Sequence, residues 1–159
     1  MDIFYLSYPK VKSIAITGTN GKSTTSKLLY EVLKAKKIDA RLTGNIGFPI
    51  LLEKKIKNET VFIIEASSYQ LDYSKFFRSN YSAILNISPD HIERHRSLRK
   101  YVEAKFKIIK KQKKGDFAFI SNNNKFLNKI LKKNKIKSKI SYVNYKKYLS
   151  KTKMLNNDY

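Results

Sequence analysis

The sequence predicts an α/β domain in which a mostly parallel, doubly wound sheet carries helices on both faces. Short apolar runs alternate along the chain with longer segments whose apolar residues recur at helical spacing, and this alternation is typical of βαβ units. The first apolar run ends at a glycine-containing turn that leads directly into an amphipathic segment. The length of 159 residues suits one such domain with a buried core and is short for two.

The first half of the chain contains two short apolar runs, Ser13–Thr17 and Thr60–Glu65, which we expect to form buried strands. Between them, residues 22–37 place Leu, Val and Ala on one helical face and end in lysines, which the helix dipole favours there. A short segment at Ala40–Thr43, a Gly-Asn-Ile-Gly turn and a short helix near Pro49–Lys55 come next. This order predicts strands and helices in alternation from the first buried strand onward.

The second half of the chain continues the alternation. Continuous apolar runs predict a third buried strand at Ser82–Ile87 and a fourth at Asp116–Ser121. Between these runs, Ser97–Lys111 has apolar residues at helical spacing, and its first serine is a suitable N-cap. A helix at Phe126–Lys133 and a weaker strand at Lys139–Val143 complete the pattern.

Composition limits the class of protein. An apolar content of 42% with 13% aromatic residues argues against a disordered chain, and the absence of cysteine excludes disulfide scaffolds and thiolate metal sites. No apolar run approaches the roughly 20 residues that span a bilayer, and the N-terminus lacks the pattern of a secretory signal. We therefore expect a cytoplasmic protein without a membrane partner, organised as a lead-in (1–12), one domain (13–144) and a tail without clear periodicity (145–159).

The formal net charge of +22 suggests a nucleic-acid partner, because Lys and Arg contacts to phosphates favour such binding. The distribution of the charge argues against this. Residues 1–98 hold 15 basic and 9 acidic side chains, residues 99–159 hold 19 and 3, and only five basic residues are arginine. The abundance of Lys, Ile and Asn is typical of AT-rich coding sequences, so we expect solvated lysines and no nucleic-acid partner. A basic nucleic-acid-binding module is the less favoured alternative.

The strongest motif, GTNGKST, lies between the first predicted strand and the first predicted helix. It consists of Gly18, Thr19, Asn20, Gly21, Lys22, Ser23 and Thr24. Glycines let main-chain N–H groups turn toward phosphate oxygens, and the positive end of the helix adds to the attraction. Lys22 is expected to reach the β- and γ-phosphates, and the Ser23 hydroxyl to coordinate Mg²⁺. The glycine normally found five residues before Gly21 is here Ile16, so the motif predicts a shortened P-loop, with a ligand-free glycine-rich turn as the alternative.

Two further polar motifs follow predicted strands. Glu65 opens the stretch EASSYQL at the strand end, on the sheet edge where doubly wound folds bind ligands. Beside a triphosphate this carboxylate would bind Mg²⁺, although it could instead cap the following turn. The stretch NISPDHIERH follows the third strand and holds both histidines of the chain. His91 is a candidate metal ligand or phosphate contact, with Asp90 to orient it, and a structural or solvated histidine is the alternative. His95 is left unassigned.

Between GTNGKST and EASSYQL, the turn GNIG places Asn45 between two glycines, either near a ligand or in a plain turn. GTNGKST, GNIG, EASSYQL and NISPDHIERH, in this order and spacing, resemble the central ATPase domain of the Mur ligases. The resemblance runs from about Ser13 to about Ser121, and EASSYQL most resembles the members that add D-glutamate. It implies an ATP-dependent ligase, with two Mg²⁺ ions, that joins D-glutamate to UDP-N-acetylmuramoyl-L-alanine through an acyl phosphate in peptidoglycan precursor synthesis. Another Mur-type or folylpolyglutamate-type ligase is the alternative.

The resemblance also implies roles for particular residues. The P-loop would hold the ATP phosphates, Ser23 and Glu65 would bind one Mg²⁺, and His91 would serve the second metal and the substrate. Asn45 and Ser67 would contact the muramoyl substrate. Lys105 resembles the family lysine that CO₂ converts to a carbamate able to bind Mg²⁺, whereas a solvated helix lysine is the alternative.

The resemblance implies a protein of three domains that acts as a monomer at full length. Both the N-terminal nucleotide domain and the C-terminal amino-acid domain are expected to be missing from these 159 residues. We therefore expect the chain to be a central-domain fragment that cannot turn over alone.

Overall fold

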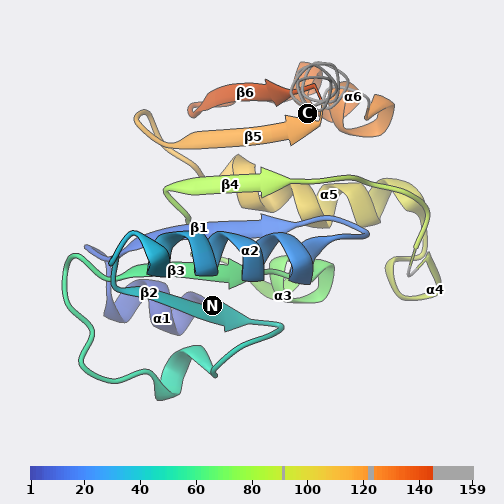
Figure 1. The fold of residues 1–159 in the computed structure, drawn as a ribbon. Coiled ribbons are helices and arrows are strands. Elements are labelled where there is room, and N and C mark those ends of the chain that lie inside the picture. Colours follow the sequence, from blue (N-terminus) through green and yellow to red (C-terminus); the bar gives the residue numbers. More distant parts are fainter. Residues whose placement is uncertain (91, 122–123, 145–159) are drawn as a thin grey trace, which may run out of the picture.

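Six parallel strands form a single sheet in the order β2-β3-β1-β4-β5-β6 in the computed structural model (Figure 1), which describes residues 1–90, 92–121 and 124–144. The strands are β1 (Lys12–Thr17), β2 (Ala40–Gly44), β3 (Val61–Glu65), β4 (Tyr81–Ile84), β5 (Phe117–Ser121) and β6 (Lys139–Val143). Every neighbouring pair among them is parallel. The predicted doubly wound α/β class is confirmed.

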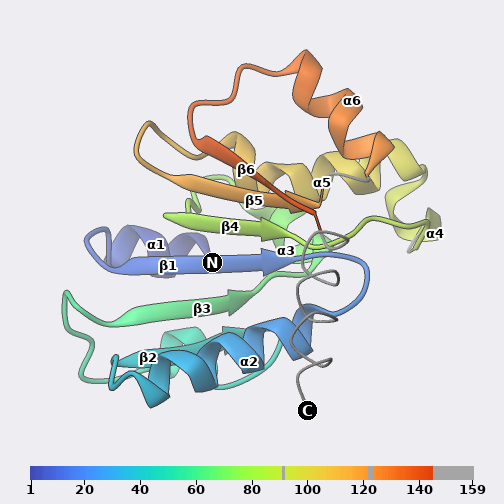
Figure 2. The ribbon, with the colours of Figure 1, turned by 45° about the horizontal axis from the view of Figure 1, so that its top comes forward.

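Helices cover both faces of the sheet, as predicted (Figure 2). They are α1 (Asp2–Ser7), α2 (Lys22–Ala35), α3 (Ser68–Tyr73), α4 (Ile92–His95), α5 (Leu98–Lys110) and α6 (Lys125–Lys133), with a 3₁₀ turn at Ile50–Leu52. One buried cluster joins α2 to Ile16 and Ile63, and the larger core lies on the opposite face beneath α1, α3, α5 and α6. None of the helices in the described part of the chain is long and apolar enough to cross a membrane.

The arrangement of α2 matters for the site. It follows the central strand β1 on one face, whereas the helices that follow the neighbouring strands β3 and β4 lie on the other face (Figure 2). The carboxyl ends of β1, β3 and β4 therefore surround a point where the chain changes sides. Open α/β sheets bind ligands in the crevice that forms at such a point.

Three short helices escaped the sequence analysis, and two predicted elements differ from the structure. The expected strand at Ser82–Ile87 ends at Ile84, and the expected helix near Pro49–Lys55 is only a 3₁₀ turn. The lead-in contains α1, which tertiary contacts hold in place. Phe4 packs against Phe62 with ring centroids 4.6 Å apart, so the stability of this helix comes from packing, which local propensity does not report.

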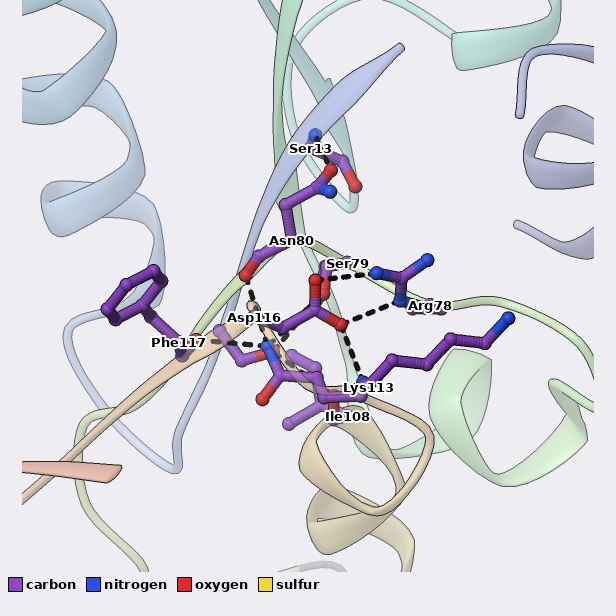
Figure 3. Close-up of polar contacts among 10 residues, drawn as sticks. Ser13, Arg78, Ser79, Asn80, Ile108, Lys113, Asp116 and Phe117 are labelled. Atoms are coloured by element: carbon purple, nitrogen blue, oxygen red, sulfur yellow. Dashed lines mark hydrogen bonds and ion pairs between the residues drawn. The ribbon is translucent and has the colours of Figure 1, made fainter. Parts of the chain in front are cut away.

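A polar network fixes the amino ends of three strands (Figure 3). Arg78 binds both carboxylate oxygens of Asp116, at 2.6 and 2.7 Å. The side-chain amide of Gln112 donates to three main-chain carbonyls, and Asn80 Oδ1 accepts from the N–H of Ser13 at 3.0 Å. We call Ser13, Arg78, Asn80, Gln112 and Asp116 the amino-end network. It ties the beginnings of β1, β4 and β5 together, away from the predicted motifs.

Candidate functional site

The predicted motifs meet at the carboxyl edge of the sheet. The loop Gly18–Thr24 connects β1 to α2, Glu65 is the last residue of β3, and the stretch from Asn86 to Asp90 follows β4. Because β1 pairs with both β3 and β4, these three segments lie next to one another. His91 lies outside the described residues, so its predicted role stays a prediction.

The P-loop leaves a row of main-chain donors without acceptors. Gly21 has φ of 78°, a left-handed conformation that glycine adopts without strain, and α2 has no side-chain cap. Within the described part of the chain, the N–H groups of Gly21, Lys22, Ser23 and Thr24 have no hydrogen-bond acceptor. Lys22 Nζ donates to the carbonyl of Thr19 at 2.8 Å. Open amides, a helix N-terminus and an ammonium group together form a site suited to an anion such as a phosphate.

Lys105 is buried against this loop. Its side chain is only 2% exposed, and its Nζ donates to the carbonyl of Gly18 at 2.8 Å and lies 4.7 Å from the centre of the Tyr101 ring. The pKa of Lys105 is lowered to about 8, mainly because the ammonium group is buried and also because Lys22 is nearby, while Asp90 partly opposes the shift. The alternative of a solvated helix lysine is therefore wrong.

Glu65 is the one buried carboxylate at this edge among the described residues, and Asn45 holds it. Its side chain is 1% exposed. Oε1 accepts from Asn45 Nδ2 at 3.3 Å, whereas Oε2 has no hydrogen-bond partner in the described part of the chain. Gly44 makes this contact possible, because at its φ of 106° a Cβ would lie 2.3 Å from the Glu65 carbonyl oxygen. That close approach lets Asn45 N donate to the same carbonyl at 2.9 Å.

The unpaired oxygen of Glu65 is what a cation site requires, since a buried carboxylate oxygen without a partner is costly. No group of three or more His, Cys, Asp or Glu in the described ranges could hold a metal by itself. In proteins, Mg²⁺ usually binds through one or two carboxylates and completes its shell with water and phosphate. The predicted ligand Ser23 lies in the first turn of α2, beside the open amides.

Ser67, rather than Glu65, caps the helix that follows β3. Its hydroxyl accepts from Gln70 N at 3.2 Å and its own N–H donates to Gln70 Oε1 at 2.9 Å. This capping box removes the alternative in which Glu65 serves only as a cap. Ser67 therefore has a structural task at the edge of the site, which leaves its predicted substrate contact as a prediction.

His95, left unassigned from the sequence, is structural in its contacts. It is 5% exposed, its Nε2 lies 3.0 Å from the hydroxyl oxygen of Ser68, and its ring stacks on Tyr69 at 5.5 Å. The sequence analysis also missed the role of Tyr101, whose hydroxyl lies 3.0 Å from Thr19 Oγ1 in the P-loop. The helical spacing of Tyr101 in the sequence predicted that its side chain is buried but gave no sign of this contact.

The fold and this loop define a P-loop α/β domain with a candidate anion site at the carboxyl edge of its sheet. The family model described as the Mur ligase middle domain matches residues 16–158. The chain belongs to the Mur ligase family.

Relatives and solved structures agree with this family. The chain is 41% identical over 130 residues to UDP-N-acetylmuramoylalanine--D-glutamate ligase of Rickettsia prowazekii (strain Madrid E), covering 82% of the chain and 29% of the relative. It is 44% identical over 113 residues to the ligase of the same name from Phenylobacterium zucineum (strain HLK1), covering 71% and 24%. The chain thus spans less than a third of the length of these curated relatives.

Among solved structures, MurF ligase from Thermotoga maritima in complex with ADP has a TM-score of 0.68 at 23% identity, covering 88% of this chain and 35% of that one. E. coli FolC in complex with DHPP and ADP has a TM-score of 0.59 at 11% identity, covering 89% and 45%. At these identities the likeness supports the fold.

Proposed function

We propose that the chain is the nucleotide-binding part of an ATP-dependent ligase that joins D-glutamate to UDP-N-acetylmuramoyl-L-alanine. The observation that carries this is the combination, on adjacent strands, of four open P-loop amides with a buried carboxylate whose second oxygen is unpaired. The names of the relatives at 41% and 44% identity support the choice of substrates. Because ATP and the UDP-linked substrate are nucleotides made inside the cell, we also propose a cytoplasmic enzyme. From the resemblance to the family we propose that the full-length protein is a monomer.

Each candidate residue has a part in this proposal. The N–H groups from Gly21 to Thr24 and the ammonium group of Lys22 would bind the ATP phosphates. Mg²⁺, when bound, supplies charge neutralisation at the phosphates; Ser23 and Glu65 would hold one ion, and His91 and a carbamylated Lys105 would hold the second. Asn45, already bonded to Glu65, and Ser67 would contact the muramoyl substrate.

The reaction consists of two displacements. The terminal alanine carboxylate attacks the γ-phosphorus of ATP, which forms an acyl phosphate and releases ADP. The amine of D-glutamate then attacks the acyl carbon, phosphate leaves, and the amide nitrogen loses a proton. Lys22 contributes by neutralising charge that builds up on the transferred phosphoryl group, and the fixed amides do so without reorganisation.

Carbamate formation at Lys105 needs its neutral amine, which attacks the carbon of CO₂ and releases a proton. Burial favours that neutral form, since the pKa of Lys105 is lowered to about 8. The change would turn a buried cation near Lys22 into an anion able to bind Mg²⁺. With ¹³C-labelled bicarbonate, a carbamate ¹³C signal should appear in the wild-type chain and be missing in Lys105→Ala. A signal that persists in the variant would place the carbamate elsewhere.

Two assays test the proposed function. Titration calorimetry on the 159-residue chain should detect MgADP and MgATP binding; a chain that binds neither contradicts the proposal. Phosphate release is then measured on the chain extended by whatever its reading frame encodes on either side. Release should require both UDP-N-acetylmuramoyl-L-alanine and D-glutamate.

The alternatives give different results in the same experiments. Phosphate release that responds to another amino acid but not to D-glutamate indicates another Mur-type or folylpolyglutamate-type ligase. Tight, sequence-specific DNA or RNA binding at physiological salt supports the nucleic-acid module, because binding through the lysine-rich surface alone weakens steeply with salt.

A further inference from the structure

Two asparagines bracket strand β4 and bind the main chain of β1 at opposite ends. Asn80, before β4, accepts from Ser13 N at the start of β1 at 3.0 Å. Asn86, after β4, accepts through Oδ1 from Thr19 N at 3.1 Å and Asn20 N at 2.8 Å. Its Nδ2 donates to the carbonyl of Asn20 at 3.0 Å. The same side chain thus occurs at both ends of one strand pair, but only Asn86 reaches the P-loop.

These bonds divide the main-chain donors of the loop into two sets. The N–H groups of Thr19 and Asn20 point to the end of β4 and are used by Asn86. The next four N–H groups, from Gly21 to Thr24, have no acceptor within the described residues. The loop therefore changes direction between Asn20 and Gly21, where Gly21 takes its positive φ of 78°.

The side chain of Thr19 provides a second attachment of the loop to the same segment. Its Oγ1 accepts from the N–H of Ser88 at 3.0 Å and lies 3.2 Å from the Ser88 carbonyl. The Thr19 N–H also lies 3.0 Å from the main-chain carbonyl of Asn86. Contacts within the chain therefore hold the first half of the loop. Thr19 N has a second acceptor in the Asn86 carbonyl, whereas within the described residues the N–H and carbonyl of Asn20 are bound by the Asn86 side chain alone.

We infer that Asn86 is a positioning residue that pre-forms the phosphate site by holding the Thr19–Asn20 half of the loop out of the anion cradle. It leaves the amides from Gly21 to Thr24 aimed at the ligand and does not itself bind the phosphate. Binding to a pre-formed loop avoids the entropy loss of ordering it, so loss of this grip should weaken anion binding. The inference rests on the proposed function only for the identity of the anion, a nucleotide phosphate.

The matched pair Asn86→Ala and Asn80→Ala tests this inference on the whole 159-residue chain. Both variants remove the same side chain from the same strand pair, and both should lower the unfolding temperature. Calorimetric titration with MgADP should show binding at least tenfold weaker in Asn86→Ala and unchanged within twofold in Asn80→Ala. Unchanged affinity in folded Asn86→Ala, or an equal loss in both variants, overturns the inference.

Amide hydrogen exchange on the wild-type chain gives a measurement that does not depend on whether a variant folds. Without nucleotide, the Asn20 amide should already be protected and the amides of Gly21, Lys22, Ser23 and Thr24 should exchange freely; MgADP should then protect these four. In Asn86→Ala, Asn20 should lose protection, whereas Thr19 keeps part of its own through the Asn86 carbonyl.

The two proposals fail in distinguishable ways. A wild-type chain that does not bind MgADP contradicts the proposed function, yet protection of the Asn20 amide without nucleotide still supports the positioning role of Asn86. Free exchange of that amide in the wild-type chain overturns the positioning role, whatever the chain binds.

Discussion

The two ends of strands β1 and β4 carry polar networks of opposite character. At the amino end, Arg78 and Asp116 pair through two hydrogen bonds, and Asp116 also accepts from Lys113 N at 2.7 Å. At the carboxyl end, Lys22 and Lys105 lie near each other, and among the described residues no carboxylate is hydrogen-bonded to either. The charges of Arg78 and Asp116 at the amino end are paired, whereas the two ammonium groups at the carboxyl end donate to main-chain carbonyls.

This difference separates stability from function along the same strands. The amino-end network is imperfect, since Gln112 Oε1 has no partner among the described residues, but its ionised groups are paired. The carboxyl end keeps a buried carboxylate oxygen and a buried ammonium in a low-dielectric setting, both of which cost stability. Functional sites commonly keep buried polar or charged groups unpaired, whereas the rest of a fold pairs them. The two ends should therefore respond differently to mutation.

The largest effect is expected at the amino end. Arg78→Ala leaves the carboxylate of Asp116, 3% exposed, without its ionic partner, which should lower the unfolding free energy by about 3 kcal/mol. MgADP affinity should stay within twofold. Chemical denaturation and calorimetry check the two values. Arg99→Ala is the control, because its pair with Glu103 is solvent-exposed and its loss should leave the unfolding free energy almost unchanged.

Lys22→Ala should show the reverse behaviour at the carboxyl end. MgADP binding should weaken at least 100-fold, about 2.7 kcal/mol, because the ammonium faces the phosphates, while the unfolding free energy changes little. Lys27→Ala, on the exposed side of the same helix, should bind normally. If Lys22→Ala bound MgADP as the wild type does, the carboxyl end would not be a phosphate site.

Glu65→Gln tests whether the unpaired oxygen is reserved for a cation. The substitution keeps the shape of the side chain and an acceptor for Asn45, and it removes a buried charge, so stability should rise by about 1 kcal/mol. The tightening of ADP binding by Mg²⁺ should shrink about tenfold, about 1.4 kcal/mol. Titrations with Mg²⁺ and with EDTA measure this ratio, and the exposed Glu31→Gln should leave it unchanged. An unchanged ratio in Glu65→Gln would remove Glu65 from the metal site.

The sequence predicted those parts of the fold that local pattern determines. Apolar runs located β1, β3, β4 and β5, and helical spacing located α2, α5 and α6. The burial of Lys105 was also readable, since it lies four residues after Tyr101 and four before Ile109, both on the buried face of α5. The charge of Lys105 argued against burial, because lysine is rarely buried without a partner.

Other features depend on contacts between distant parts of the chain. Asn86 accepts from N–H groups that lie 66 and 67 residues earlier in the sequence. These partners follow from the β1–β4 register and could not be predicted from the motif itself. The same holds for the hydroxyl of Tyr101, 82 residues from Thr19. The motif thus predicted the sheet edge at which these residues meet, while the tertiary fold decided which contacts each residue makes there.

The smallest effect of a mutation is expected at Asp2, through which α1 is hydrogen-bonded to the segment that precedes Arg78. Burial raises the pKa of Asp2, but hydrogen bonds from Ser74 and from the N–H groups of Lys75 and Phe77 outweigh it and lower the pKa to about 2. A carboxylate whose pKa is lowered in the folded state stabilises the fold. This contribution is fully present at pH values above the pKa in the unfolded state, 3.8, and it is lost as the pH falls toward the folded-state pKa of about 2.

Asp2→Asn should therefore lower the unfolding free energy at pH 7 by about 1 kcal/mol, allowing for solvent screening of this partly exposed group. The difference from the wild type should fade between pH 4 and pH 2, because both side chains are then neutral. Urea unfolding across this range measures it. A constant difference down to pH 2 would show that Asp2 stabilises α1 through shape alone. In that case the charge of Asp2 would not contribute to stability, and of these three side chains only Arg78 and Asp116 would stabilise this end of the strands through their charges.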